Sequence, residues 1–262
     1  MQYQKTPALL RYPGSKWSNA GKIIDLFGDH FHYVEPYFGS GAVFFSKPAS
    51  GHEVINDING DVVNFWRVLR DSTEELCWAL ETTPWSRQEL EVSRVPSDDP
   101  VEAARRFAVR AWQSRASDMS KAVGWRSRGS KQRAGGMSHR WQKLPAQLQA
   151  VAGRLSDAEI EHKDALDVIS AYSTEDTLLY LDPPYVFDTA RTQTLYANEV
   201  DDTHHEAMLA LAASHPGPVV ISGYDSDLYD KHLEGWYKVS LSAGKVEGGA
   251  RRTEVLWSNR VV

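Results

Sequence analysis

The sequence predicts an α/β fold with a mostly parallel sheet and a helical region inserted into it. Short apolar runs that end in an acid alternate with helical patterns, first over residues 33–70 and again over 157–222, and this alternation is typical of parallel sheets. Residues 72–155 show little strand character. At 262 residues, the chain is long enough for one large domain or a core domain with an insertion.

The first half of the predicted sheet contains two strands, at 33–36 and 53–57. Gly39-Ser40-Gly41 follows the first strand and indicates a tight turn into a helix at 42–45, and a longer helix is expected at 61–70. A strand, a glycine turn, a helix and a second strand that ends in an acid form an α/β nucleotide-binding pattern.

The middle of the chain contains two helical patterns, at 100–113 and 141–155. Residues 126–140 between them are rich in Arg, Ser and Gly, too polar to build a core, and are expected to form a loop. A second long connection, 186–202, is interpreted as a lid.

The second half of the sheet is expected from strands at 157–162, 177–181 and 219–222, with a helix at 203–214. Residues 236–241 and 253–259 alternate well enough to form a closing antiparallel pair.

Asp182-Pro183-Pro184-Tyr185 directly follows the apolar run 177–181. The prolines donate no amide hydrogen, so their carbonyls stay available as acceptors. A carboxylate, a carbonyl and an aromatic ring suit a flat heterocycle with an exocyclic amine. The alternative is an ordinary strand end followed by a turn.

Asp57 ends the second strand about 16 residues after Gly41, where a dinucleotide fold places the acid that binds ribose hydroxyls. The alternative is a cap on the following helix. Lys16 follows a glycine turn without phosphate-loop spacing, and could offer a cation to a zwitterionic ligand.

The charge is unevenly distributed. The net charge is −6, yet residues 103–143 contain eleven Lys and Arg against one acid, Asp118, a formal +10. This asymmetry predicts a polyanion-binding surface on an acidic body, unless the segment is a solvated loop without a partner.

The remaining composition is that of an ordinary soluble protein. No run approaches the roughly 20 apolar residues of a membrane span, and the first residues lack the apolar core of a signal peptide. The single cysteine, Cys77, excludes an internal disulfide and is expected to be packing. We therefore expect a cytoplasmic protein without membrane contact.

Four motifs in order resemble the Dam-type (α-group) N6-adenine-specific DNA methyltransferases. They are Arg-Tyr-Pro-Gly-Ser-Lys at 11–16, Glu-Pro-Tyr-Phe-Gly-Ser-Gly at 35–41, Asn-Asp-Ile-Asn at 56–59 and Asp-Pro-Pro-Tyr at 182–185. Residues 252–259 resemble the closing strand of that family. The resemblance implies a Rossmann-like AdoMet-dependent methyltransferase sheet from 1–70 and 156–262, with an inserted helical target-recognition region at 71–155.

The resemblance also implies S-adenosylmethionine (AdoMet) as methyl donor and no metal. The residues implied to bind AdoMet are Tyr12, Lys16, Glu35, Phe38, Gly39, Gly41, Asp57, Asp164 and Asp182. Asp164 is the candidate contact to the cofactor adenine, although its sequence is also that of a common helix start.

The implied reaction is methyl transfer to N6 of an adenine flipped out of double-stranded DNA. Asp182 and the Pro183 carbonyl would accept hydrogen bonds from the amine, and Tyr185 would stack on the base. Phosphates would be held by the basic residues Arg126, Arg128, Lys131, Arg133 and Arg140, with Trp112, Trp125 and Trp141 as stacking or packing residues. Whether a cognate restriction nuclease is a partner stays open, as does the oligomeric state.

Other targets stay open at this stage: cytosine N4, an RNA adenine, or no reaction at all in a nucleic-acid-binding relative. Two departures from the family, around 110–114 and at Ser222-Gly223-Tyr224-Asp225, leave the target sequence open. His204 and His205 at a helix start are interpreted as surface or capping residues rather than metal ligands.

Overall fold

The computed structural model describes residues 6–115, 124–126, 136–184, 201–241, 244–245 and 251–260. Residues 186–200 of the expected lid and most of the loop at 126–140 therefore lie outside the described residues, as do Tyr185, Arg128, Lys131 and Arg133.

The sheet has seven strands in the order β3-β2-β1-β4-β5-β9-β6. The bounds are β1 His32–Glu35, β2 His52–Asn56, β3 Ala158–Glu161, β4 Thr177–Leu181, β5 Val219–Tyr224, β6 Tyr237–Ser240 and β9 Glu254–Ser258. The first five strands in this order are parallel, whereas β9 runs antiparallel to β5 and β6. A separate pair joins β7 Gly244–Lys245 to β8 Arg251–Arg252. The α/β class and the closing antiparallel pair are confirmed.

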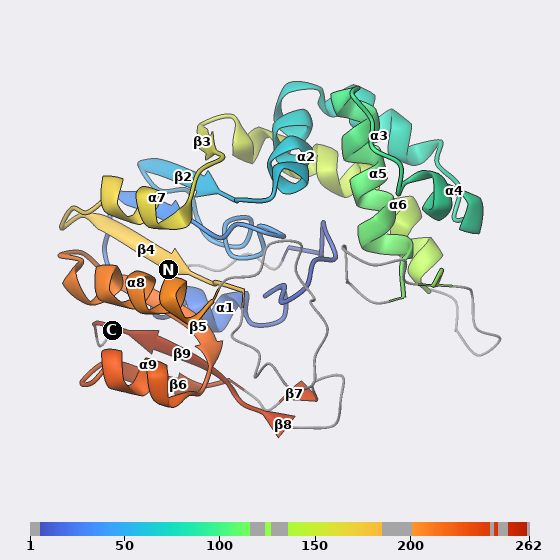
Figure 1. Cartoon of the computed structure of the whole chain (residues 1–262). Coiled ribbons are helices and arrows are strands. Elements are labelled where there is room, and N and C mark those ends of the chain that lie inside the picture. Colours follow the sequence, from blue (N-terminus) through green and yellow to red (C-terminus); the bar gives the residue numbers. More distant parts are fainter. Residues whose placement is uncertain are drawn as a thin grey trace.

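Alternate residues of the buried strands enter two different cores, because successive side chains of a strand point to opposite faces. Val34, Leu179 and Ile221 belong to the core beneath α7 Ala165–Ala171, α8 Asp202–Ser214 and α9 Asp227–His232. These three helices lie in a row along one face of the sheet (Figure 1).

The opposite face packs against the larger core. Tyr33, Leu178 and Tyr180 point into it, beside α1 Ala20–Ile24 and α2 Gly60–Asp71. Both faces of β4 and β5 are thus covered, which explains why these two strands appear as continuous apolar runs in the sequence.

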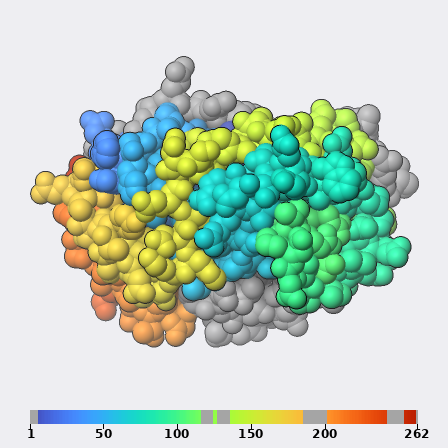
Figure 2. Space-filling view, turned by 90° about the horizontal axis from the view of Figure 1, so that it is seen from above, coloured from blue at the N-terminus to red at the C-terminus, as the bar shows by residue number. Residues whose placement is uncertain are grey.

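The other helices gather at one end of the molecule (Figures 1 and 2). They are α3 Thr73–Glu81, α4 Arg87–Val92, α5 Pro100–Gln113 and α6 Met137–Ala152, which continues as a 3-10 turn at Gly153–Leu155. Helix α5 packs against α2 and α3, and α3 packs against α6. The start of α5 follows from local chemistry, because Asp99 accepts a hydrogen bond from the Glu102 amide and Pro100 needs no partner in the first turn.

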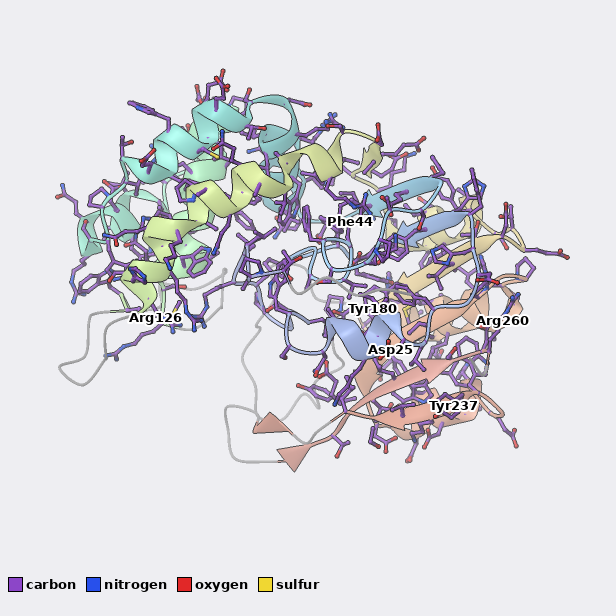
Figure 3. The ribbon with its side chains drawn as sticks, turned by 180° about the vertical axis from the view of Figure 1, so that it is seen from behind. Asp25, Phe44, Arg126, Tyr180, Tyr237 and Arg260 are labelled. Atoms are coloured by element: carbon purple, nitrogen blue, oxygen red, sulfur yellow. The ribbon has the colours of Figure 1, made fainter. Side chains whose placement is uncertain are left out.

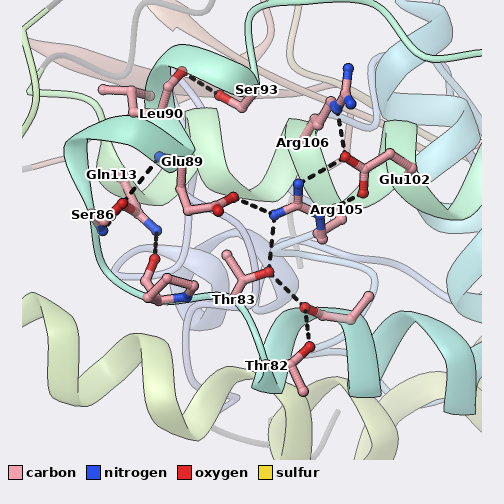
Figure 4. A network of polar contacts seen from close by, with 12 residues as sticks. Thr82, Thr83, Ser86, Glu89, Leu90, Ser93, Glu102, Arg105, Arg106 and Gln113 are labelled. Atoms are coloured by element: carbon pink, nitrogen blue, oxygen red, sulfur yellow. Dashed lines mark hydrogen bonds and ion pairs between the residues drawn. The ribbon is translucent and has the colours of Figure 1, made fainter.

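A polar network fastens α4 to α5 (Figure 4). The Arg105 guanidinium donates to Glu89 at 2.7 Å, to both oxygens of Glu102 at 2.6 and 2.8 Å, and to the Thr83 hydroxyl at 3.0 Å. Arg106 also donates to Glu102, at 2.6 Å. These bonds to the two arginines lower the pKa of Glu102 to about 2.

One expected element is wrong: residues 42–45 form turns and not a helix. Two helix-like bonds form there, from the Phe45 amide to Gly41 and from the Lys47 amide to Val43. The segment then ends at Pro48, and two such bonds are too few for a stable helix. The short helices α1, α4 and α9 were not expected, since each has only five or six residues.

Within the described ranges, no helix is both long and apolar enough to cross a membrane.

Candidate active site

The carboxyl ends of β1, β2 and β4 bring three acidic side chains to one edge of the sheet. Glu35 is the last residue of β1, while Asp57 and Asp182 directly follow β2 and β4. Strand β1 lies between β2 and β4, and the chain crosses from one side of β1 to the other. Such a switch point is where open α/β sheets bind ligands.

Asp182 is held by two donors from distant parts of the chain. Lys16 Nζ lies 2.8 Å from Asp182 Oδ1, and the Ser222 hydroxyl donates to the same oxygen at 2.7 Å. Ser222 in turn contacts the Tyr180 hydroxyl at 3.1 Å. Burial raises the pKa of Asp182, while Lys16 and Ser222 act in the opposite direction. The carboxylate is therefore fixed through Oδ1, which leaves Oδ2 on its other side.

Lys16 is almost completely buried, at 4% exposure, and contacts a second carboxylate. Its ammonium group donates to the Gly14 carbonyl at 2.6 Å and lies 3.3 Å from Glu254 Oε1. Burial alone would lower the pKa of Lys16, but Asp182 and Glu254 outweigh it and raise the pKa. Lys16 is consequently a permanent cation inside the site.

Asp57 is bound by two backbone amides. The Gly39 amide donates to Oδ2 at 2.8 Å, and the Asn59 amide donates to Oδ1 at 2.9 Å. Burial raises the pKa of Asp57 to about 6, against the effect of both amides. The helix that follows is capped by Asn59, which accepts from the Asp61 amide. The alternative interpretation of Asp57 as the helix cap is therefore wrong.

The glycine turn packs tightly. Gly39 and Gly41 have φ values of +47° and +66°, which only glycine adopts without strain. A Cβ on Gly39 would lie 3.1 Å from the ring of Tyr12, and one on Gly41 would lie 2.8 Å from Phe38 and Phe45. The structure thus brings Tyr12 onto the turn, next to Asp57.

The side chains of Glu35 and Phe38 are buried below the surface of the site, too deep to contact a ligand directly. Glu35 is 2% exposed and accepts a hydrogen bond from the Tyr33 hydroxyl at 2.7 Å, and burial raises its pKa well above the usual value. The Phe38 ring packs edge-on against Phe44 and Trp66 in the core. The Phe38 backbone is also engaged, because its amide donates to the Asn56 carbonyl and its carbonyl accepts from the Gly41 amide, both at 2.8 Å, so Phe38 shapes the turn and is not placed in direct contact with a ligand.

Asp164 caps α7 by accepting from the Leu166 amide at 2.8 Å, and it is exposed. It lies at the end of β3, which Asn56 ties to the site. The Asn56 side chain donates to the carbonyls of Pro36 and Lys163 and accepts from the Lys163 amide. Asn56 thereby holds the ends of β1, β2 and β3 together.

Two of the expected basic residues are described. Arg126 donates to the carbonyls of Ser114 and Arg115, beyond the end of α5, and Arg140 is exposed on α6. Figure 3 shows Arg126 at the edge of the helical region, far from Arg260. Arg11 lies near Arg126 and Arg140. Burial lowers the pKa of Arg11, and the charges of these two arginines lower it further.

The tryptophans divide as follows. Trp112 and Trp141 are buried, and their indole N–H groups donate to the carbonyls of Leu9 and Thr83. Packing is therefore confirmed for both. Trp125 is half-buried, with the Arg87 guanidinium 5.4 Å from its ring centre.

Sequence reasoning missed Ser222, Glu254 and Asn56, although a signal was present. The strand predicted at 219–222 ends at Ser222, and parallel strand ends meet at one edge. Glu254 starts an antiparallel strand opposite Tyr224, the last residue of β5. Because β9 runs antiparallel to β5, it begins at the edge of the sheet where β5 ends. Glu254, the first residue of β9, therefore lies at the site.

The sequence of this chain is similar to those of known methyltransferases. Residues 12–245 match the family of D12 class N6 adenine-specific DNA methyltransferases. A segment of 79 residues is 42% identical to the Type II methyltransferase M1.LlaDCHI of Lactococcus lactis subsp. cremoris, and it covers 28% of this chain and 27% of that protein. The matched segment thus spans about a quarter of that relative.

Two solved structures align over most of this chain, with TM-scores below 0.5. A conserved hypothetical protein of Streptococcus pyogenes has a TM-score of 0.40 at 12% identity, covering 92% of this chain and 95% of its own. A putative methyltransferase, yhhF, of Escherichia coli has a TM-score of 0.42 at 9% identity, covering 97% and 91%. The family match extends over most of the sequence and includes the three strand-end motifs at 35–41, 56–59 and 182–185. The chain therefore belongs to the D12 class of N6 adenine-specific DNA methyltransferases.

Proposed function

We propose that this protein transfers a methyl group from AdoMet to N6 of a flipped-out adenine in a specific double-stranded DNA sequence. The observation that carries the proposal is the Asp182 carboxylate, fixed through Oδ1 by Lys16 and Ser222 at the switch point of the sheet. Family membership supports adenine N6 in DNA over cytosine N4 or RNA.

The residues around the glycine turn fit AdoMet. Asp57 offers a buried carboxylate whose two amide partners leave further lone pairs for ribose hydroxyls. Tyr12 lies on the turn, and the exposed Asp164 offers an acceptor to an exocyclic amine. AdoMet, when bound, supplies a methyl group already activated on a sulfonium, so the protein chiefly aligns donor and acceptor.

Asp182 Oδ2 and the Pro183 carbonyl would accept hydrogen bonds from the target amine. These bonds favour a more tetrahedral nitrogen and stabilise the positive charge that develops on N6. Lys16 favours the ionised form of Asp182, against the effect of burial, without itself contacting the base. Tyr185, outside the described residues, is proposed to stack on the base.

DNA would bind along the helical region 71–155, which we propose as the target-recognition region, with 1–70 and 156–262 as the catalytic part. Arg11, Arg126 and Arg140 would contact phosphates, together with Arg128, Lys131 and Arg133 from the residues that are not described. The relative named as a Type II methyltransferase supports a cognate restriction nuclease as partner.

The test is methyl transfer from labelled AdoMet to unmethylated duplex DNA, with the product nucleoside identified by chromatography. We expect N6-methyldeoxyadenosine from the wild type and none from Asp182→Ala, while DNA binding persists. The matched control is Asp176→Ala, because Asp176 lies just before β4 at the opposite edge of the sheet and should not affect transfer. N4-methylcytosine would correct the target base, and transfer to RNA alone would correct the substrate. Equal loss of transfer and DNA binding in Asp182→Ala would contradict the assigned role.

A further inference from the structure

His205 contacts the proline turn of the candidate active site directly. Its Nε2 lies 3.1 Å from the Pro184 carbonyl oxygen, and its Nδ1 lies 2.9 Å from the Tyr229 hydroxyl. The side chain comes from the first turn of α8 and is completely buried, at 0% exposure. The expected surface or capping role is therefore wrong for His205. The capping residue is Asp201, which accepts from the His204 amide.

The partners of His205 define its protonation. The Pro184 carbonyl can only accept, so Nε2 carries the proton and donates. Nδ1 is then an acceptor, and the Tyr229 hydroxyl donates to it. Both nitrogens of a neutral ring are thus satisfied. Burial lowers the pKa of His205 to about 4, and the nearby His204 lowers it further, while Asp201 and Asp202 raise it. The low pKa agrees with a neutral ring.

The turn depends on such side-chain contacts. Residues 183 and 184 are prolines without amide hydrogens, so they cannot donate to the rest of the sheet edge. One end of the turn is held at the Asp182 carboxylate by Lys16 and Ser222. The other end is held at the Pro184 carbonyl by His205. The Pro183 carbonyl lies between these two fixed points.

We propose that His205, oriented by Tyr229, is a positioning residue that fixes the Pro184 carbonyl and so aims Asp182 and the Pro183 carbonyl at the target amine. This inference rests on the proposed function, since it concerns the same acceptors. Helix α9 orients the ring because Tyr229 itself is buried, 3% exposed, against Trp257. His205 does not contact substrate and acts only through the turn.

Two substitutions separate the two ring contacts. His205→Gln places an amide N–H near the position of Nε2 and can still donate to Pro184, whereas His205→Asn reaches only as far as Nδ1. A buried histidine at the other end of α8 supplies the control. His215 has the same pattern of contacts, with Nε2 3.3 Å from the Tyr172 carbonyl and Nδ1 accepting from the Gly217 amide, away from the candidate site.

The experiment measures single-turnover methyl transfer, AdoMet and DNA dissociation constants, and thermal unfolding for all variants. We expect His205→Asn to slow transfer between about tenfold and a hundredfold, because a small misplacement of reacting groups has effects of that size. Both dissociation constants should stay within about twofold. His205→Gln should recover most of the rate, and His215→Asn should lose stability without losing transfer.

Three results would overturn the inference. They are equal rate loss in His205→Gln and His205→Asn, rate loss that follows the melting temperature across all variants, and normal transfer in His205→Asn. Nitrogen NMR of the ligand-free protein tests the bond without activity: the His205 ring should be the neutral Nε2–H tautomer at pH 7. A charged ring or the Nδ1–H tautomer would refute the bond. If the wild type has the Nε2–H tautomer but methylates no DNA, the proposed function would be refuted. The role of the bond in catalysis would be refuted with it.

Discussion

Asp57 is buried and Asp182 is half-buried, both at strand ends, and their partners give the two carboxylates different chemistry. Asp57 has two neutral amide donors, which do not offset the desolvation of its charge, and its pKa rises to about 6. Asp182 has the ammonium of Lys16 at 2.8 Å. A full opposite charge favours the ionised form far more than an amide does. Lys16 and Ser222 thus act against the burial that raises the pKa of Asp182, while Asp57 is left able to gain from a ligand.

AdoMet affinity should rise with pH between 5 and 7. The pKa of Asp57 is about 6 in the folded protein, above the value near 3.8 that it has in the unfolded chain. The stability that Asp57 contributes to the folded protein is therefore complete below pH 3.8 and is lost as the pH rises through about 6. The ionised carboxylate is then stabilised only by the Gly39 and Asn59 amides, until hydroxyl donors arrive with the ligand. If binding requires that form, affinity should increase about tenfold from pH 5 to pH 7, as measured by calorimetry.

Asp57→Asn should bind AdoMet more weakly and with little dependence on pH in this range. Asp164→Asn serves as the control, because Asp164 is exposed and its replacement should weaken binding without changing the pH profile. Wild-type affinity that is flat or falls from pH 5 to pH 7 would contradict the role of Asp57 as a hydroxyl acceptor.

At the scale of elements, local chemistry defines where helices begin, and contacts between elements decide whether short ones survive. Helix α5 starts at the predicted residue because Asp99 and Pro100 form a complete cap. Helix α4 has only six residues, and its charged side chain Glu89 is tied to α5 through Arg105. A helix this short is marginal in isolation, so we attribute its stability to the partner helix.

Arg105→Met should lower the free energy of unfolding by about 2 kcal/mol, because Glu89, Glu102 and Thr83 would lose a shared donor in a half-buried place. Urea unfolding measures the change. Arg70→Met is the matched control: Arg70 pairs with the exposed Asp71 on α2, and removing such a pair costs under about 0.5 kcal/mol. Equal effects of the two substitutions would show that the network does not fasten α4.

At the scale of the whole molecule, the basic segment is less positive than its residue count indicates. Arg105, Arg106 and Arg110 pair with acids that lie outside residues 103–143, namely Glu89, Glu102 and Asp61. The remaining positive charge lies around Arg126 and Arg140. Arg11, from the start of the chain, adds to it. The candidate DNA surface therefore lies beyond the end of α5 and along the start of α6.

The salt dependence of DNA binding tests this surface. Arg140→Gln and Arg11→Gln should each weaken binding and reduce the slope of log affinity against log salt by roughly 0.9 for every DNA phosphate that the variant no longer neutralises. Lys231→Gln is the control, because Lys231 is exposed on α9, far from α6 (Figure 1). An unchanged slope in both arginine variants would remove them from the interface.

Much of the fold could be predicted because its signals are local. Strand β4 and helix α5 have the predicted bounds, since an apolar run before an acid and two prolines, or a capped amphipathic pattern, needs only neighbouring residues. Residues 42–45 were mispredicted because their apolar character comes from aromatic packing onto Trp66 and not from a helix face.

The sequence by itself determined the α/β class, the order of the strand-end motifs, and the family to which they belong. Only the tertiary structure decided how the candidate site is held. It joined Lys16, Asp182, Ser222 and Glu254 from four separate segments, and it placed His205 beneath the proline turn. The physical reason is that a pattern along the chain specifies which side chains are buried, whereas a hydrogen bond between distant residues depends on the packing of whole elements against one another.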